Sequence, residues 1–510
     1  MFKLIDGQNE TVKNCIDYSP AIRGVVSVTS EQEIKDLLHE ANTKGFSIYP
    51  YSRGNNWGYG AKAPISSNSV LLDLSAMNEI SGYDDQLGIV TVQPGVTYQQ
   101  LNHYLSNQSS QWLTPVHGGG PECSVLGNIL ERGFGLTPIE DHFGAARSFR
   151  CLLPDGSLYQ SKLTSMGLGR IDQAGKWGIG PYLDGLFTQS NFGVVTQVTL
   201  QLAPNPQSIA MFRAGLQQSD LPKAIAAVRE LQKDFRGVLG GVNLLNQARV
   251  VSMFTSYPSE KAMNNQPLTK LEIEGLSESL MAPDWTIIGS LYGPKPVVKA
   301  VSKLIQKRLK AVCGSYQYID ESRLDIAQKV FNFLPNRWFS GYRQQLSAVH
   351  EAFQIFRGTP KNTALNLAYW VRNPQLPKTF RPDADDCGLI WYSPLIEMRA
   401  ERVSQFCQSM EHLSQQYGQN NLITLTCFDS SMFEATVPIL YNKTVEGASK
   451  AARDFYLQAL AENRKLGFHP YRLPIFAMEP IYNASGDGLE DRIKRALDPN
   501  RVIAPGRYIK

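Results

Sequence analysis

The sequence predicts a two-domain α+β protein. Three observations lead to this prediction: a length of 510 residues, strands and amphipathic helices that alternate over the first 200 or so residues, and a Pro-Asn-Pro break at residues 204–206. A single hydrophobic core seldom grows beyond roughly 250–300 residues, so a chain of this length divides. Because two prolines in three residues cannot continue a strand through a sheet interior, we place a domain boundary at that break.

Capping boxes mark two helices in the first part of the chain. Ser30 is followed three residues later by Glu33, and apolar residues then recur at helical spacing until Gly45. Thr97 and Gln100 repeat this signature ahead of a second apolar pattern. In such a box, two side chains satisfy backbone N–H groups at the helix start, so both positions predict where a helix begins.

Short apolar runs predict the strands, and longer amphipathic runs predict further helices. The expected strands cover residues 46–49, 70–74, 88–92, 198–202, 285–291 and 389–392. The expected helices of the second half cover residues 221–235, 297–311 and 448–466. Glycine-containing segments that favour tight backbone turns occur at residues 51–60, 118–120 and 191–196. We therefore expect an α/β layer followed by an α+β domain.

Composition and charge argue against several classes of protein. Fifty Lys and Arg against 46 Asp and Glu give a net charge of +4, without a basic run that would follow a nucleic acid. The seven cysteines show no C-x-x-C pair or zinc-ligand spacing, so we expect reduced thiols and no metal. No secretory signal and no apolar stretch of about 18 residues is present, which favours a cytoplasmic protein.

The loop at residues 52–56, Ser-Arg-Gly-Asn-Asn, is the first candidate for ligand binding. A loop that surrounds a pyrophosphate needs successive N–H groups pointing inward, and glycine allows that turn. Neither the phosphate-binding pattern G-x-x-x-x-G-K-[ST] nor a G-x-G-x-x-G between a strand and a helix is present, which argues against a kinase or an NAD-binding Rossmann domain. An ordinary surface turn is the alternative reading of this loop taken alone.

Several segments together resemble the flavoproteins of the vanillyl-alcohol oxidase and p-cresol methylhydroxylase family. They follow the order of that family and bracket nearly the whole chain: residues 49–64, 118–128, 131–142, 187–196, 471–472 and 498–506. The resemblance implies an FAD-binding domain over residues 1–205, a cap domain for the substrate over 206–460, and a return to the FAD-binding domain over 461–510.

The resemblance also implies which residues bind FAD. These are Ser52, Arg53, Gly54, Asn55, Asn56, Gly119, Ser124, Gly127, Asn128, Thr137, Gly193, Val195 and Arg507. Many relatives attach FAD covalently, but the loop at 53–60 contains no histidine, and Leu389 occupies the position that would carry a link from the cap. We therefore expect non-covalent FAD, with Tyr392 as the attachment point if the alignment shifts by three residues.

Four residues match the catalytic positions of that family. Tyr59, Tyr471 and Arg472 would form an anion hole for a phenolic oxygen. Two phenol donors and a guanidinium in a dry pocket favour phenolate over phenol, and phenolate pushes electrons toward the para carbon. A hydride can then leave the benzylic carbon for flavin N5, giving a quinone-methide-like intermediate. Asp141 is the candidate general base toward water or a group near N5, although it could instead close a turn.

The leading hypothesis is therefore an FAD-dependent oxidase or dehydrogenase of para-substituted phenols. A non-phenolic alcohol, a 2-hydroxy acid or a biosynthetic intermediate is the first alternative, because Arg472 suits a carboxylate as well as a phenolate. A catalytically idle flavin-binding protein is the second alternative. The electron acceptor stays open between dioxygen and a cytochrome-type partner, and we expect a homodimer or a higher homo-oligomer.

Overall fold

The computed structural model describes residues 5–333, 347, 349–372, 379–479 and 487–510. Its contacts divide the chain into two compact units. The first comprises Met1–Gly135, Asp141–Pro204 and Leu473–Lys510, and the second comprises Leu136–Glu140 and Asn205–Arg472. The sequence predicted domain boundaries near residues 205 and 461, and this division places them between residues 204 and 205 and between residues 472 and 473.

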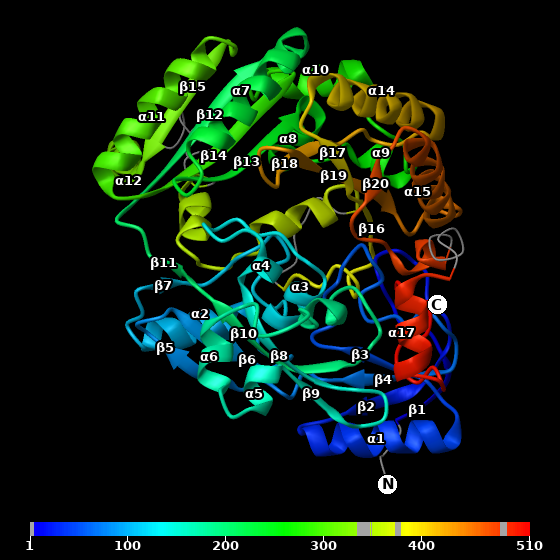
Figure 1. The fold of residues 1–510 in the computed structure, drawn as a ribbon. Coiled ribbons are helices and arrows are strands. Elements are labelled where there is room, and N and C mark those ends of the chain that lie inside the picture. The colour runs from blue at the N-terminus through cyan, green and yellow to red at the C-terminus, as the bar shows by residue number, and fades with distance from the viewer. Residues whose placement is uncertain (1–4, 334–346, 348, 373–378, 480–486) are drawn as a thin grey trace. The chain divides into compact units, whose positions relative to one another are not determined.

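The first unit contains a four-stranded, partly parallel sheet (Figure 1). Its strands, in spatial order, are β1 (Ile5–Glu10), β2 (Ile22–Ser27), β4 (Ser69–Asp73) and β3 (Ile48–Tyr51). Strand β4 is parallel to both neighbours, so β2 and β3 require a crossover, and α1 (Glu31–Lys44) provides it. The predicted capping box of Ser30 and Glu33 is confirmed, and α1 ends at Gly45 in the left-handed conformation.

A second sheet of the first unit is antiparallel and has five strands. In spatial order they are β5 (Ile80–Asp84), β6 (Ile89–Val92), β10 (Val194–Gln201), β8 (Ala146–Leu152) and β9 (Leu158–Gln160). After β10 ends, Pro204 takes part only in a two-residue pair between β11 (Ala203–Pro204) and β7 (Trp112–Leu113). This ending agrees with the missing N–H of proline, which cannot extend a ladder.

Short helices complete the first unit. They are α2 (Tyr98–Asn107), α3 (Val125–Leu130), α4 (His142–Ala145), α5 (Lys162–Ser165), α6 (Gly169–Ala174) and α17 (Leu489–Leu497), with 3₁₀ turns at Asp184–Phe187 and Ile475–Ala477. The capping box of Thr97 and Gln100 at the start of α2 is also confirmed.

A nine-stranded sheet, antiparallel throughout, forms the centre of the second unit. In spatial order the strands are β15 (Ser315–Asp320), β12 (Ser208–Leu216), β14 (Trp285–Gly293), β13 (Leu239–Asn246), β18 (Thr424–Cys427), β19 (Met432–Asn442), β17 (Pro394–Glu397) and β20 (His469–Pro470), while β16 (Cys387–Tyr392) pairs with β19.

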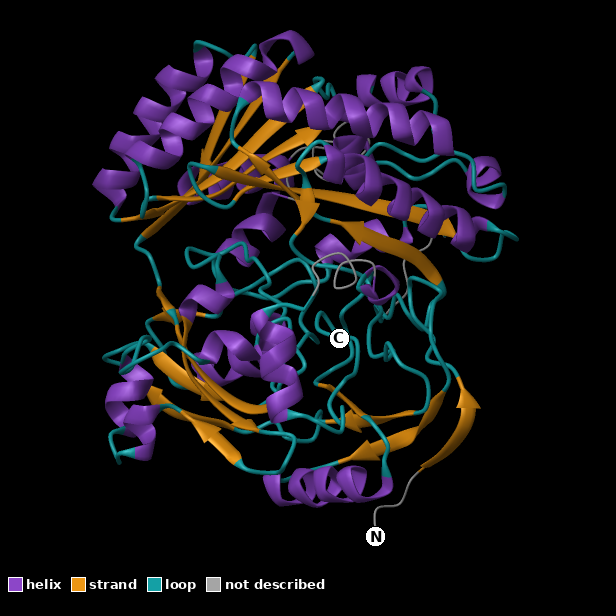
Figure 2. Ribbon diagram, turned by 45° about the vertical axis from the view of Figure 1, so that its right-hand side comes forward, coloured by secondary structure: helices purple, strands orange, loops and turns teal. Residues whose placement is uncertain are grey.

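Helices pack on both faces of this sheet through apolar side chains, and several long ones lie together on one face (Figure 2). The helices of the unit are α7 (Leu221–Asp234), α8 (Gln247–Phe254), α9 (Ser259–Met263), α10 (Lys270–Glu278), α11 (Lys295–Lys310), α12 (Glu321–Phe333), α14 (Ala400–Tyr417) and α15 (Ala448–Lys465), with 3₁₀ turns at Gln218–Asp220 and Thr363–Tyr369. Helix α7 buries Ile225, Val228 and Leu231 at helical spacing, and α11 does so with Val298, Ile305 and Leu309. Among the described residues, no helix is long and apolar enough to cross a membrane.

A buried lysine ties the C-terminal segment to the rest of the first unit. The Lys494 ammonium on α17 is 2% exposed and forms a 2.6 Å ion pair with Asp498. It also donates to the carbonyl oxygens of Asn191 at 2.6 Å and Ile503 at 3.0 Å. Three acceptors match the three protons of an ammonium group, so this charge is fully hydrogen-bonded although it lies out of water.

We expect Lys494→Ala to lower the free energy of unfolding of the FAD-loaded protein by about 3–5 kcal/mol. The substitution would leave the Asp498 carboxylate buried without its counter-charge, which costs that amount in comparable pairs. Urea denaturation followed by far-ultraviolet circular dichroism measures the change.

Lys450→Ala is the matched control, because the Lys450–Asp454 pair also spans four residues on a helix but has side chains 75% and 47% exposed. Exposed pairs contribute roughly 0.5 kcal/mol or less. Equal losses in the two variants would contradict the importance of the buried pair.

Candidate functional site

The glycine-rich loop after β3 turns through left-handed conformations. Gly54, Gly58 and Gly60 have φ angles of 68°, 76° and 120°. Residues with a Cβ rarely adopt such angles, which explains why glycine occupies these positions. A Cβ on Gly60 would also lie 3.0 Å from side-chain atoms of Ile475. Both the conformation and the space around this loop depend on glycine.

The same loop presents N–H groups that can bind an anion. In the described part of the chain, the backbone N–H groups of Arg53, Gly54 and Asn55 donate to no protein acceptor. The buried indole N–H of Trp57 also lacks a protein hydrogen-bond partner there. Donors that a fold gathers without acceptors fit a pyrophosphate, which offers several oxygens. These residues therefore fit the phosphate part of FAD.

A second predicted segment lies beside this loop within the first unit. The Asn55 side chain donates to the Glu122 carbonyl at 3.0 Å, and Arg53 lies 3.7 Å from the Glu122 carboxylate. Ser52 Oγ would lie 3.2 Å from a Cβ placed on Gly127. The structure thus brings the loop at residues 52–55 together with the distant segment that contains Glu122 and Gly127.

Helix α3 begins at this junction. The Ser124 hydroxyl accepts the Gly127 N–H at 2.9 Å, and a Cβ on Gly119 would lie 2.2 Å from the His117 ring. Asn128 Oδ1 lies 2.5 Å from His142 Nδ1. Burial lowers the pKa of His142 to about 4, so the ring is neutral at pH 7, and the amide oxygen requires the proton on Nδ1.

Arg507 lies in a buried network near the C-terminus. Its guanidinium donates to the Tyr49 hydroxyl at 2.7 Å and pairs with Glu131. The Arg507 and Glu131 side chains are 14% and 15% exposed, so this arginine near the C-terminus is not a solvated side chain. The network joins the last residues to β3 and to the end of α3.

Tyr471 and Arg472 are the last two residues of the second unit. The Tyr471 N–H donates to the Ser393 carbonyl at 3.2 Å, and its ring meets the edge of Phe428 with centroids 5.4 Å apart. The positive charge of Arg472 acts on the buried carboxyl of Glu434. Tyr471 is therefore held by contacts of its backbone and ring, and the charge of the next residue, Arg472, reaches a buried acid.

Two predicted catalytic residues belong to the first unit. Tyr59 is 7% exposed, and its carbonyl accepts the Ile475 N–H at 3.1 Å. Asp141 is exposed and is the N-cap of α4, where its carboxylate accepts the Gly144 N–H at 2.7 Å. The turn-closing role weighed for Asp141 is thus present, and a catalytic role for it stays a prediction.

Thr137 lies in the short segment that belongs to the second unit. Its hydroxyl is buried and, within the described chain, has no protein hydrogen-bond partner. Glu140 of the same segment has a buried Oε1 that lies 2.8 Å from the position of a Cβ on Gly241. Burial raises the pKa of Glu140 to about 8, so this carboxyl is largely protonated at neutral pH.

Gly193 and Val195 contribute to strand packing. A Cβ on Gly193 would lie 2.5 Å from Cys151 Sγ and 2.8 Å from the Leu152 carbonyl. Val195 pairs with Cys151 across β10 and β8. Packing between strands explains the glycine here, and a contact of either residue with FAD stays a prediction.

Four residues with clear roles in these contacts were not singled out from the sequence: Tyr49, Glu131, His142 and Glu434. Glu131 and His142 lie inside the resemblance segment 131–142, but Arg507, the partner of Glu131, is 376 residues away along the chain, and Asn128, the partner of His142, is 14 residues away. Glu434 interrupts the mostly apolar run of β19. A lone acid in a buried strand was a signal that could have been used.

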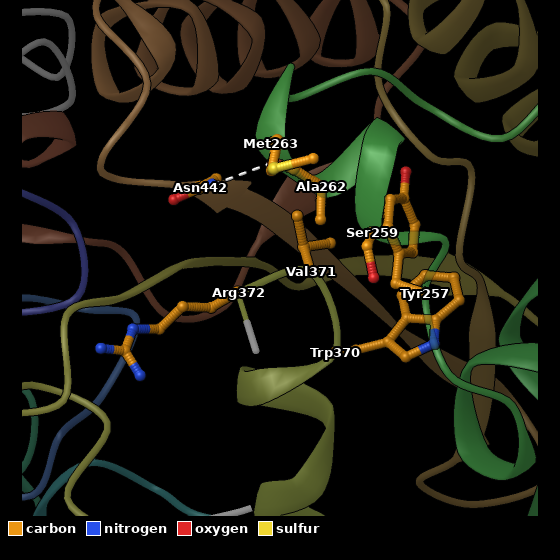
Figure 3. A pocket seen from close by; sticks show the side chains of 8 residues that line it. All are labelled: Tyr257, Ser259, Ala262, Met263, Trp370, Val371, Arg372 and Asn442. Carbon is orange, nitrogen blue, oxygen red and sulfur yellow. Dashed lines mark hydrogen bonds between the residues drawn. The ribbon is translucent and has the colours of Figure 1, made fainter. Parts of the chain in front are cut away.

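A small pocket lies elsewhere in the second unit (Figure 3). Tyr257 and Trp370 line it with ring centroids 4.7 Å apart, and Asn442 donates to the Ala262 carbonyl beside it at 2.9 Å. Tyr59, Asp141, Tyr471 and Arg472 do not line this pocket.

Comparison with known proteins identifies the class of this chain. The family model of the FAD binding domain matches residues 22–161. A 1'-carboxy-chondrochloren decarboxylase of Chondromyces crocatus is 29% identical over 500 residues, covering 96% of this chain and 90% of that protein. The flavoprotein subunit of 4-cresol dehydrogenase (hydroxylating) of Pseudomonas putida is 24% identical over 489 residues, covering 94% and 87%. The crystal structure of p-cresol methylhydroxylase with bound substrate superposes with a TM-score of 0.84 at 22% identity, covering 98% of this chain and 91% of that one.

The chain is an FAD-dependent oxidoreductase with the p-cresol methylhydroxylase fold. The predicted resemblance, the two-domain α+β fold and the FAD cofactor are therefore confirmed. In this flavoprotein, the loop donors at 53–55 and Trp57 would hold the pyrophosphate, and the start of α3 lies beside them.

We expect Gly60→Ala to reduce FAD binding. A Cβ at φ 120° and 3.0 Å from Ile475 must displace the loop, and backbone strain of this kind costs about 1–3 kcal/mol. The flavin-to-protein absorbance ratio after gel filtration measures the loss, and thermal unfolding separates it from general instability.

Gly167→Ala provides the control, because Gly167 has φ of 81° but has no neighbouring atom within 4 Å of the added Cβ. This variant should lose about 1 kcal/mol of stability and keep its flavin. Retention of flavin by both variants would show that the loop conformation does not limit binding.

Proposed function

We propose that this flavoprotein removes a hydride from the benzylic carbon of a para-substituted phenol. Tyr471, which Ser393 and Phe428 hold in place, and its neighbour in sequence, Arg472, carry the proposal. A phenol side chain and a guanidinium side by side offer charge-assisted hydrogen bonds to one phenolate oxygen. The 4-cresol dehydrogenase relative, which matches 94% of this chain, acts on a para-substituted phenol by its name.

Tyr59 completes the proposed anion hole. Its carbonyl accepts the N–H of Ile475, which follows Arg472 by three residues. Hydrogen bonds from the two hydroxyls and the guanidinium would stabilise the phenolate, which pushes electron density toward the para carbon. Bound FAD supplies the hydride acceptor.

Asp141 is the proposed base for the second half of the reaction. Its exposed carboxylate can accept a proton from water while its backbone position is fixed by the cap of α4. Water that adds to the quinone methide would give a hydroxylated product. Loss of a proton from the neighbouring carbon would instead give an alkene.

We also propose that FAD is held without a covalent bond. Leu389 on β16 is 3% exposed and has no nucleophilic atom. The Tyr392 hydroxyl donates to the Ala459 carbonyl at 3.1 Å, and its ring packs on Tyr456. This arrangement supports a packed strand tyrosine rather than an attachment point.

We expect 4-ethylphenol and vanillyl alcohol to bleach the visible flavin band under anaerobic conditions. Tyr59→Phe should slow the bleaching about 100-fold, the lower end of the loss on removing one oxyanion donor. Stopped-flow absorbance measures the rate, and 4-ethylanisole, which cannot form a phenolate, should leave the flavin oxidised.

The matched control is Tyr83→Phe, because Tyr83 is a partly exposed tyrosine whose hydroxyl bonds to Asp85. Its rate and flavin content should equal those of the parent protein. If no phenol bleaches a flavin that dithionite reduces, the phenol assignment is wrong, and carboxylated non-phenolic alcohols become the next substrates to test.

A second candidate is oxidative decarboxylation of a carboxylated para-alkylphenol. The 1'-carboxy-chondrochloren decarboxylase relative, which matches 96% of this chain, favours it. Hydride loss from the benzylic carbon would give the same quinone methide. The bond to a carboxylate on the next carbon can then break, so that carbon dioxide leaves and its electron pair restores the aromatic ring as a vinylphenolate.

We expect 3-(4-hydroxyphenyl)propanoic acid to give 4-vinylphenol and one carbon dioxide per flavin reduced if this second candidate holds. A substrate with a ¹³C-labelled carboxyl group makes the released gas measurable by mass spectrometry. Flavin bleaching without labelled carbon dioxide would support the phenol oxidation and exclude the decarboxylation.

A further inference from the structure

Glu434 is a buried acid in the middle of the nine-stranded sheet. Its side chain is on β19, opposite Thr426 of β18 and Leu395 of β17, and the residue is 5% exposed. The Thr436 hydroxyl donates to its carboxyl group at 2.6 Å. An acid is rarely this deeply buried unless hydrogen bonds or a nearby charge support it.

The carboxyl group lies on the sheet face opposite α15, the face against which α8 and α12 pack further along the sheet. Tyr392 pairs with Val437, and its hydroxyl reaches the Ala459 carbonyl of α15. The odd-numbered positions of β19 therefore face α15, and they include the buried Phe433 and Val437. Because strand side chains alternate between faces, Glu434 and Thr436 point the other way.

Hydrogen bonds connect Glu434 to the proposed anion hole. Ser393 hydrogen-bonds to the Glu434 carboxyl, and the carbonyl of the same Ser393 accepts the Tyr471 N–H at 3.2 Å. Arg472 acts on Glu434 by its charge. One serine thus bridges the acid and the segment that would bind the phenolic oxygen.

The surroundings keep Glu434 able to exchange a proton near neutral pH. Burial raises its pKa to about 7, against hydrogen bonds from Thr436 and Ser393 and the charge of Arg472, which lower it. The facing residues on adjacent strands, Thr426 and Leu395, are uncharged. On β20, the strand beyond β17, His469 pairs with Leu395, and its ring Nδ1 hydrogen-bonds to the Pro470 carbonyl.

A phenol that binds as phenolate must give its proton to another group. Arg472 with ionised Glu434 has no net charge, and Arg472 with protonated Glu434 and a phenolate has none either. A proton transferred to Glu434 therefore leaves the net charge of the buried site unchanged and avoids the cost of burying an unpaired ion. Release of the proton to solvent would instead change that charge.

We propose that Glu434 accepts the proton that the phenolic substrate gives up on binding. The substrate O–H bond breaks, an O–H bond forms on the Glu434 carboxyl group, and no electrons change hands. This inference rests on the proposed phenol chemistry and assigns a proton acceptor that precedes hydride loss.

The test counts protons while a phenol binds to the FAD-loaded protein. The probe is 4-chlorophenol, which has no benzylic hydrogen and is neutral in solution at pH 8. Ultraviolet difference spectra report phenolate, and isothermal titration in two buffers of different ionisation enthalpy gives the protons released per ligand. We expect phenolate with almost no proton release in the parent protein. In Glu434→Gln, we expect phenolate with about one proton released.

Glu397→Gln is the control, because Glu397 lies on β17 of the same sheet, pairs with Arg402 and has a side chain 50% exposed. It should release almost no protons.

Thr436→Val serves if Glu434→Gln does not fold. Losing the hydrogen bond from Thr436 raises the pKa of Glu434. The pH range in which phenol binding releases almost no protons should therefore shift to higher pH. Bound phenolate with unchanged proton release in both variants would overturn the role of Glu434 alone. Failure of the parent protein to bind 4-chlorophenol as phenolate would overturn the proposed function and this inference together.

Discussion

The Lys494 ammonium is the interaction on which the first unit depends most. Its three acceptors come from the loop before β10, from the end of α17 and from the C-terminal segment. By holding these three stretches, the lysine positions the last residues of the chain, and Arg507 then reaches Tyr49 of β3. A unit that joins segments from both ends of a chain needs such a link, because chain entropy otherwise opposes their meeting.

In the second unit, the two faces of the sheet near β18 and β19 carry different kinds of side chain. Helices α7, α11, α14 and α15 cover one face and bury apolar side chains. The opposite face carries polar groups at β18 and β19, among them Thr426, Thr436 and Glu434, and apolar clusters under α8 and α12 elsewhere. The strand period of two allows one continuous segment to build both the core and a polar surface. Tyr471 is held at the edge of this sheet, through Ser393.

Sequence patterns predicted the helices and strands better than they predicted the contacts between distant residues. Capping boxes at Ser30 and Thr97 marked helix starts because their chemistry is local, within four residues. Asp141 shows the opposite case, since the sequence did not decide between a turn and a catalytic base, and the structure gives it a capping hydrogen bond. Glu434 was overlooked, because its importance arises from Ser393 and Arg472, which lie in other segments of the chain.

The sequence alone determined the class of protein: the glycine loop, the ordered segments of the resemblance and the local helix signals sufficed for an FAD-dependent oxidoreductase of two domains. These features are short-range, so they can be read without knowing which distant residues meet. Tertiary structure decided how the charged groups are paired and how their pKa values shift. Burial and long-range pairing gave Lys494 its acceptors, bound Arg507 to Glu131 and raised the pKa of Glu434. Desolvation depends on what folds over a residue, which no local pattern contains.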